Sequence, residues 1–261
     1  STGAVTYSYT GTGSTTYGPS STRPIGAGTY KVVATLAADA NFTGATSADY
    51  AFTINKAVIT ITAANQNVSF GTAVSAVTGA GSYTPTGFVN NETASVISGT
   101  VSYTTTYTST SAAGTTGLTI TPVVTGLTAT NYSFTSANGT VSVGSSGSTI
   151  VVTGAQTYTY TGSPQGPAAH SKTGSTGAVT YSYTGTGSTT YGPSSTRPTG
   201  AGTYKVVATL AADANFIGAT SADYAFTINK ASSTISVTGS QTYTYTGSPQ
   251  GPNTHEKTGS T

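Results

Sequence analysis

The sequence contains no cysteine, methionine or tryptophan, and only 5% of its 261 residues are charged. Without cysteine the chain has no disulfide bond, no thiolate ligand for zinc and no thiol nucleophile. Eight basic residues against six acidic ones give a formal net charge of +2, which is too little for a nucleic-acid-binding or lipid-binding surface. No apolar run approaches the roughly 18 residues of a membrane-spanning helix. We therefore expect neither nucleic acid nor membrane as a partner of this segment.

The chain is rich in hydroxyl residues, with 60 Thr, 34 Ser and 18 Tyr. They alternate with apolar residues, as in Val5–Thr10, Tyr30–Leu36 and Thr157–Thr161. Successive strand residues point to opposite faces, so a period of two gives one buried and one solvated face. No segment has a convincing helical stripe. The sequence predicts an all-β protein.

Long segments of the sequence occur twice. Residues Ser1–Ala57 recur as Ser175–Ala231, and the copies differ only at Ile25/Thr199 and Thr43/Ile217. Residues Ser148–Thr176 recur as Ser233–Thr261 with a few changes. One complete repeat therefore extends from about Ser146 to Lys230, which is about the size of an immunoglobulin-like β-sandwich.

The complete repeat and the segment before it both contain several expected strands. In the repeat we expect Thr149–Thr153, Gln156–Thr161, Ala178–Thr184, Thr203–Ala211 and Asp223–Asn229. His170 lies between two of these strands and is expected in a loop. In the different module between the two copies, the expected strands are Val58–Thr62, Asn67–Phe70, Gly99–Thr108, Leu118–Val124, Tyr132–Thr135 and Thr140–Val143.

The repeats predict four ranges in an elongated array of tandem sandwich modules. Residues 1–56 form an immunoglobulin-like module without its first strands, 57–144 a second type, 145–230 a complete module, and 231–261 the first strands of a further copy. Each module should measure about 35–45 Å at about 3.3 Å per strand residue. Two explanations of the ends stay open: the chain is an excerpt from a longer array, or residues 232–261 complete the first module of another subunit.

Several motifs resemble the MBG-type repeats of bacterial surface proteins. In the complete repeat they are Tyr158–Gly162, Gly177–Tyr183, Arg197–Tyr204, Ala211–Phe216 and Ile228–Ala231. The middle module resembles a second MBG-type class through Ile59–Ala63, Phe70–Thr72, Thr86–Val89, Asn131–Phe134 and Asn138–Val141. The resemblance implies tandem immunoglobulin-like modules in a very large secreted adhesin or surface filament.

This resemblance implies an extracellular, non-enzymatic structural protein on the bacterial cell surface. The function that fits it is a stalk or spacer that projects a distal adhesive tip. The alternatives are glycan-binding adhesive modules, or a filament subunit that polymerises by β-strand complementation. The expected partners are neighbouring repeats and, for the adhesive alternative, surface glycans.

The titratable residues give no catalytic arrangement. They are Asp39, Asp49, Glu92, Asp213, Asp223, Glu256, His170 and His255. Several are duplicates of one another, and no pair has a spacing suited to acid–base work. We therefore predict no catalytic, cofactor-binding or metal-binding residue, and no cofactor.

Three structural details can also be predicted. Asp213 and Asn215, like Asp39 and Asn41, fit a turn in which the side chain bonds nearby backbone better than they fit a calcium site. Lys31 and Lys205 could suggest a Lys–Asn crosslink, but they lie on the face opposite the apolar residues and are expected in solvent. Tyr30 and Tyr204, each in an Ala-Gly-Thr-Tyr segment, resemble a tyrosine corner, with a core aromatic as the alternative.

Overall fold

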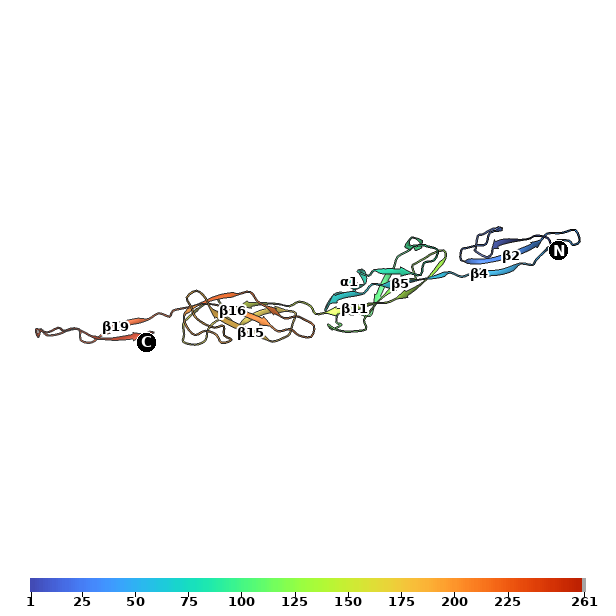
Figure 1. Ribbon diagram of the computed structural model, residues 1–261. Coiled ribbons are helices and arrows are strands. Elements are labelled where there is room, and N and C mark those ends of the chain that lie inside the picture. The colour runs from blue at the N-terminus through green and yellow to red at the C-terminus, as the bar shows by residue number, and fades with distance from the viewer. Residues whose placement is uncertain (260–261) are drawn as a thin grey trace. The chain divides into compact units, whose positions relative to one another are not determined.

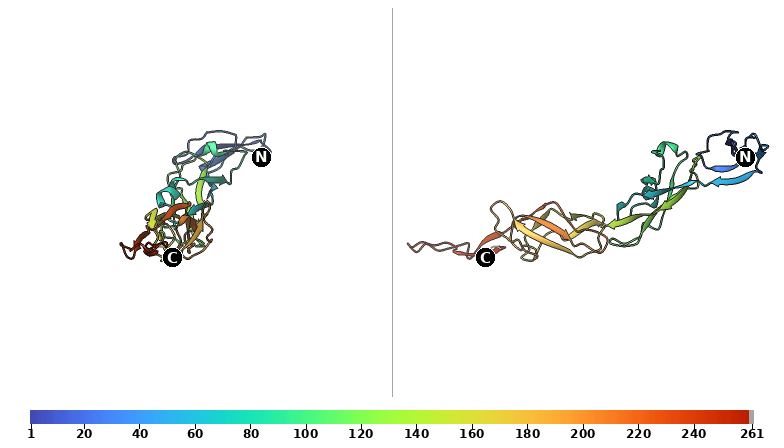
Figure 2. Two further views of the ribbon diagram at one scale, coloured as in Figure 1. Left: turned by 90° about the vertical axis from the view of Figure 1, so that its left-hand side faces the viewer. Right: turned by 45° about the vertical axis from the view of Figure 1, so that its right-hand side comes forward.

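The computed structural model describes residues 1–259 and consists almost entirely of strands, with 43% strand and 3% helix. The all-β prediction is confirmed. The chain divides into two compact units, of which unit 1 is Ser1–Gly144 and unit 2 begins at Ser145. Strands dominate both units in every view (Figures 1 and 2). The predicted range 231–261 extends beyond the described residues at its last two positions.

The first copy of the repeated segment forms an antiparallel sheet in unit 1. Strand β2 lies at its centre and pairs with each of the other three strands. The strands are β1 (Val5–Gly11), β2 (Gly28–Leu36), β3 (Ala45–Thr46) and β4 (Tyr50–Ile54). The Thr/Tyr/Val alternation fits this pleated sheet because β-branched and aromatic side chains pack well on it.

The remainder of unit 1 contains two further sheets, ordered β10-β5-β7 and β6-β11-β9-β8. Ile59 and Ile61, two residues apart on β5, are fully buried in one core, and Ile120 is fully buried in another. The elements are β5 (Ala57–Ala63), β6 (Gln66–Ser69), α1 (Val74–Gly79), β7 (Tyr83–Thr86), a 3-10 turn (Ala94–Val96), β8 (Ser102–Thr105), β9 (Thr119–Val123), β10 (Tyr132–Ala137) and β11 (Gly139–Gly144).

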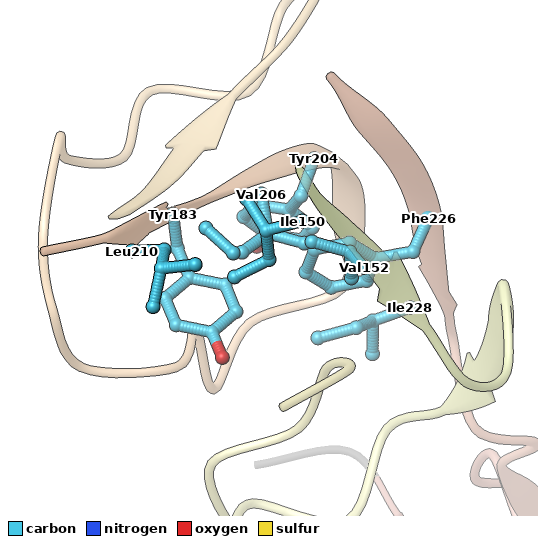
Figure 3. Close-up of a cluster of buried hydrophobic side chains, with 9 residues drawn as sticks. Ile150, Val152, Tyr183, Tyr204, Val206, Leu210, Phe226 and Ile228 are labelled. Atoms are coloured by element: carbon cyan, nitrogen blue, oxygen red, sulfur yellow. The ribbon is translucent and has the colours of Figure 1, made fainter. Parts of the chain in front are cut away.

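Unit 2 contains the second copy together with the segment that precedes it. A five-stranded sheet, ordered β13-β18-β16-β15 with β17 also paired to β16, shares one core with the two-stranded sheet β12-β14. The strands are β12 (Thr149–Thr153), β13 (Thr157–Thr159), β14 (Ala169–Thr173), β15 (Val179–Gly185), β16 (Gly202–Leu210), β17 (Ala219–Thr220) and β18 (Tyr224–Asn229). Side chains from both sheets meet in this core (Figure 3).

A final antiparallel pair repeats the register of β12 and β14. In β12 and β14, Val152 lies opposite His170, and in the last pair Val237 lies opposite His255. The two strands are β19 (Thr234–Thr238) and β20 (Thr254–Thr258).

The strand predictions are confirmed in most places, but the loop assigned to His170 is wrong. His170 lies in β14, whose sequence Ala169–Thr173 is polar and lacks the apolar alternation by which the other strands were identified. The short helix α1 was also missed, since it buries only Val77 and is too short for a helical stripe. Two predicted strands are longer than the strands that form, because β13 covers Thr157–Thr159 of Gln156–Thr161 and β8 covers Ser102–Thr105 of Gly99–Thr108.

Candidate functional site

The two candidate tyrosine corners have the expected geometry. Tyr30 Oη donates a hydrogen bond to the Gly26 carbonyl oxygen at 2.7 Å, and Tyr204 Oη donates to the Gly200 oxygen at 2.8 Å. Both rings are also buried in the core, and Tyr204 stacks on Phe226 with ring centroids 5.3 Å apart. The hydroxyl-to-backbone bond is confirmed, and its role is structural.

The Asp213 carboxylate organises the turn between β16 and β17 of the second copy. Its Oδ1 accepts hydrogen bonds from the Asn215 and Phe216 backbone N–H groups, each at 2.9 Å. Its Oδ2 accepts from the Thr176 N–H at 2.7 Å and from the Thr176 hydroxyl at 3.0 Å. These donors, led by the Thr176 and Asn215 N–H groups, lower the pKa of Asp213 to about 2. The predicted turn role is confirmed.

Asp39 repeats this arrangement in the first copy. Its carboxylate accepts from the N–H groups of Asn41, Phe42 and Thr2. The Asn41 and Thr2 N–H groups are the main reason that the pKa of Asp39 lies far below its usual range. In both copies the carboxylate lone pairs are thus directed at backbone donors of the turn.

Lys31 and Lys205 each form an ion pair with an aspartate. Lys31 Nζ lies 2.9 Å from Asp49 Oδ2, and Lys205 Nζ lies 2.8 Å from Asp223 Oδ2. The lysine side chains are 38% exposed, as expected for the solvated face of the sheet. The ion pairs themselves were missed, since they depend on the β2–β4 and β16–β18 register. Exposed pairs of this kind contribute roughly 0–1 kcal/mol.

His170 contacts Tyr181 of β15, which belongs to the other sheet of unit 2. Its Nδ1 atom lies 2.7 Å from Tyr181 Oη, and that hydroxyl donates to the Ala168 carbonyl oxygen at 2.8 Å. The Tyr181 hydroxyl therefore links the His170 imidazole to the Ala168 backbone. This contact holds β14 against β15 and forms no acid–base pair with a carboxylate.

Glu92 has a buried partner that sequence analysis missed. The hydroxyl of Tyr132, which is 2% exposed, donates a hydrogen bond to Glu92 Oε2 and accepts one from the Val89 N–H at 3.1 Å. The bond to Glu92, followed by burial, raises the pKa of Tyr132. This contact holds the loop that contains Asn90 and Asn91, the non-glycine residues with positive φ in the described chain.

A hollow of about 710 Å³ in unit 1 lies where the first copy meets the next module. Asn131 Oδ1 accepts a hydrogen bond from the Ala27 N–H at 3.0 Å beside it, and Lys56 Nζ donates to the Ala129 carbonyl oxygen at 2.9 Å. Its lining consists of Ser14–Tyr17, Ile25–Tyr30, Thr53–Lys56, Thr130 and Asn131. Lys56 is the charged residue of this lining, so the hollow offers hydroxyl and amide groups without an acid–base pair.

The remaining titratable residues are not brought together. Glu256 lies in β20 opposite Ser236. Within residues 1–259, no group of three or more His, Cys, Asp or Glu side chains could hold a metal ion. In the same described range, no helix has the length and apolar character needed to cross a membrane.

The two copies and the middle module match two related family models. The MBG domain model matches residues 1–58 and 148–232, and the model of the MBG domain of YGX type matches residues 59–142. The chain belongs to the MBG domain family. MBG domains are found in large surface proteins, and the MBG families are non-catalytic structural or adhesive repeats. No curated protein and no solved structure matches the chain.

Proposed function

We propose that the chain is a structural spacer in a large extracellular surface protein of a bacterium. In this role tandem immunoglobulin-like β-sandwich modules form an elongated array and hold a distal adhesive part away from the cell. The division into the ranges 1–56, 57–144, 145–230 and 231–261 belongs to this proposal.

The observation that carries the proposal is the near-identity of the two copies in sequence and in internal bonding. Each copy has the same tyrosine corner, the same aspartate-centred turn and the same Lys–Asp pair. These contacts hold strands and turns in place. The function of a spacer depends on the length and stability of each repeat, so it tolerates duplicate modules that lack a unique site.

The connection between the first copy and the middle module supports limited flexibility within unit 1. The chain passes from β4 into β5 through Asn55 and Lys56, with neither glycine nor proline. In contrast, Gly144–Ser148 is rich in glycine and serine, which is typical of a flexible linker.

Small-angle X-ray scattering on the full chain tests the array. At the lowest measurable concentration we expect a maximum dimension of about 100–130 Å, from the strand rise and the number of modules. A maximum dimension of about 50 Å, as for one compact globule of this length, would contradict it.

A glycan array with the full chain tests the adhesive alternative. We expect no saturable binding, because the contacts described above are internal. Saturable binding that free glycan competes away would replace the spacer with an adhesive module as the function of these repeats.

A further inference from the structure

The first two strands of the middle module, β5 and β6, run parallel to its last two strands, β10 and β11. Residues 57–62 lie opposite residues 132–137. Residues 66–69 lie opposite residues 141–144. In both pairs each residue lies opposite the one 75 positions later, so the register is the same throughout the module.

The paired strands change sheets together, and the Asn65 side chain bridges the bend. Strands β5 and β10 belong to one sheet of the module, whereas β6 and β11 belong to the other. Between the two pairs, Asn65 Oδ1 accepts a hydrogen bond from the Thr140 N–H at 2.8 Å. The amide oxygen of this side chain thus takes the place of a backbone carbonyl and keeps the contact continuous across the bend.

Backbone hydrogen bonds extend the contact at both ends. The Ala57 N–H donates to the Asn131 carbonyl oxygen at 3.0 Å, and the Phe70 N–H donates to the Gly144 carbonyl oxygen at 2.8 Å. Residues 57–70 form the entry strand of the module, and residues 131–144 form its exit strand. These two strands are therefore joined from one end of the module to the other.

Tension along the chain loads this contact in shear. The chain continues before residue 57 and after residue 144, so tension enters the module at the start of β5 and leaves it at the end of β11. Because the strands are parallel, these two points lie at opposite ends of the contact. Hydrogen bonds between strands lie across the strand direction, so all of them resist sliding together, whereas opening from one end breaks them one at a time.

Sliding of the two strands would also disrupt two cores. Ile59 and Ile61 of the entry strand are fully buried in one core, and Val141 and Val143 of the exit strand are buried in the other. A shift by one residue turns every side chain of a strand to the opposite face of its sheet. A shifted register therefore loses the burial of these side chains as well as the hydrogen bonds.

The complete repeat has a contact of the same kind over a shorter stretch. Strand β13 runs parallel to β18, with residues 157–159 opposite residues 227–229. The Tyr160 N–H extends this contact by donating to the Asn229 carbonyl oxygen at 2.8 Å. The first strand of this repeat, β12, pairs with β14 instead. The middle module thus has the longer direct contact between its first and last strands.

We propose that the entry and exit strands of the middle module form a mechanical clamp, which keeps the module folded under tension. The β5–β10 and β6–β11 contacts bear the load, and the Asn65 side chain joins the two contacts. The use of this clamp rests on the proposed spacer function, because a spacer between a cell and an adhesive part is stretched when the adhesive part is held. The middle module then bears load in addition to supplying length.

Stretching single molecules of the full chain in two directions tests the clamp. The natural chain has no cysteine, so two introduced cysteines can serve as the attachment points of the pulling handles. Handles at Val58→Cys and Ser142→Cys draw the strands past each other, whereas handles at Val58→Cys and Thr135→Cys open the contact from one end. All three side chains are exposed, so neither pair of substitutions disturbs a core.

At the same loading rate, we expect the unfolding force in the sliding direction to be at least about twice the force in the opening direction. Equal forces in the two directions would overturn the clamp. That result would leave the elongated array unaffected, because X-ray scattering tests the array separately.

The variant Asn65→Ala tests the bridge across the bend. It removes the acceptor of the Thr140 N–H from an exposed position. With handles at positions 58 and 142, we expect the unfolding rate at constant tension to rise about fivefold, because one loaded hydrogen bond is lost. The variant Asn65→Asp keeps an acceptor oxygen and should retain the rate of the chain with Asn65. An unchanged rate in Asn65→Ala would overturn the role of Asn65 in the clamp.

The matched control is Thr106→Ala. Thr106 is exposed, and its Oγ1 atom accepts a hydrogen bond from the Thr119 N–H, also at 2.8 Å. This bond lies beside the β8–β9 pair and joins neither the entry nor the exit strand. Without tension, Thr106→Ala and Asn65→Ala should speed hydrogen exchange of the module by similar factors. Under tension, Thr106→Ala should leave the unfolding rate unchanged, and equal acceleration by both variants would overturn the clamp.

Discussion

The hydroxyl group of Tyr204 shows how one atom fixes the start of a long strand. It donates to the Gly200 carbonyl four residues earlier, and this bond closes the loop that leads into β16. The Tyr204→Phe variant keeps the ring in the core and removes the bond, so we expect the unfolding free energy to fall by about 1 kcal/mol. Hydrogen exchange of a peptide covering residues 197–210, which Thr199 distinguishes from the first copy, should become about five-fold faster.

The control for this variant is Tyr160→Phe. Tyr160 is 43% exposed, and its hydroxyl has no hydrogen bond within the described residues. Removal of the Tyr160 hydroxyl should leave hydrogen exchange of the 197–210 peptide unchanged. Equal effects of the two variants would contradict a specific role for the corner hydroxyl.

Asp213 makes the stability of the second copy depend on pH. Its folded-state pKa of about 2 lies below the ordinary 3.8, so its contribution is present above pH 3.8 and is lost as the pH falls towards 2. We expect Asp213→Asn to lower the thermal unfolding temperature by a few degrees at pH 6. The difference in unfolding temperature between variant and wild type, measured by circular dichroism, should decrease steadily below pH 4. A gap that stays constant down to pH 2 would show that the charge is unimportant.

Some residue contacts were predictable and others were not. The Ala27–Tyr30 segment predicted the tyrosine corner, and the Asp39 turn followed from the way Asp bonds nearby backbone, because both are local. The Glu92–Tyr132 contact joins residues 40 positions apart, and only the three-dimensional course of the loop brings them together. The Lys31–Asp49 pair likewise depends on a register that alternation alone does not set.

At the scale of strands, alternation located the elements with an apolar face and missed those without one. Strand β12 coincides with the predicted Thr149–Thr153, because Ile150 and Val152 mark its inner face. Strand β14 was missed since its residues are polar, and it forms because its backbone pairs with β12. Tertiary pairing thus decided the structure where the local pattern was weak.

Gly166 lets the segment Ser148–Gly174 approach β18 closely. Its φ is +135°, and a Cβ atom there would lie 2.9 Å from the Phe226 ring. We expect Gly166→Ala to lower the unfolding free energy by about 1–3 kcal/mol, through overpacking and backbone strain. Gly147→Ala is the control, because a Cβ atom at Gly147 meets nothing within 4 Å. Equal changes in unfolding free energy for the two variants, measured by denaturant unfolding, would contradict the close approach of Gly166 to Phe226.

At the scale of the whole chain, repetition was the most informative property of the sequence. It predicted that Ser1–Ala57 and Ser175–Ala231 share a fold, and the strand registers agree residue for residue between β1–β2 and β15–β16. The difference in burial between the copies could not be derived from their own residues. It depends on Ile150, Val152 and Tyr158, which precede the second copy Ser175–Ala231.

The two copies should therefore differ in stability although their sequences are nearly the same. Val206, Leu210 and Phe226 are buried in the second copy, and burying one such side chain contributes roughly 1.5–3 kcal/mol. We expect amide exchange in β2 to be at least about tenfold faster than in β16. Peptides covering residues 23–36 and 197–210 measure this, because Ile25 and Thr199 give them different masses. Equal exchange rates in the two peptides would show that burial by the segment Ser148–Gly174 does not stabilise β16.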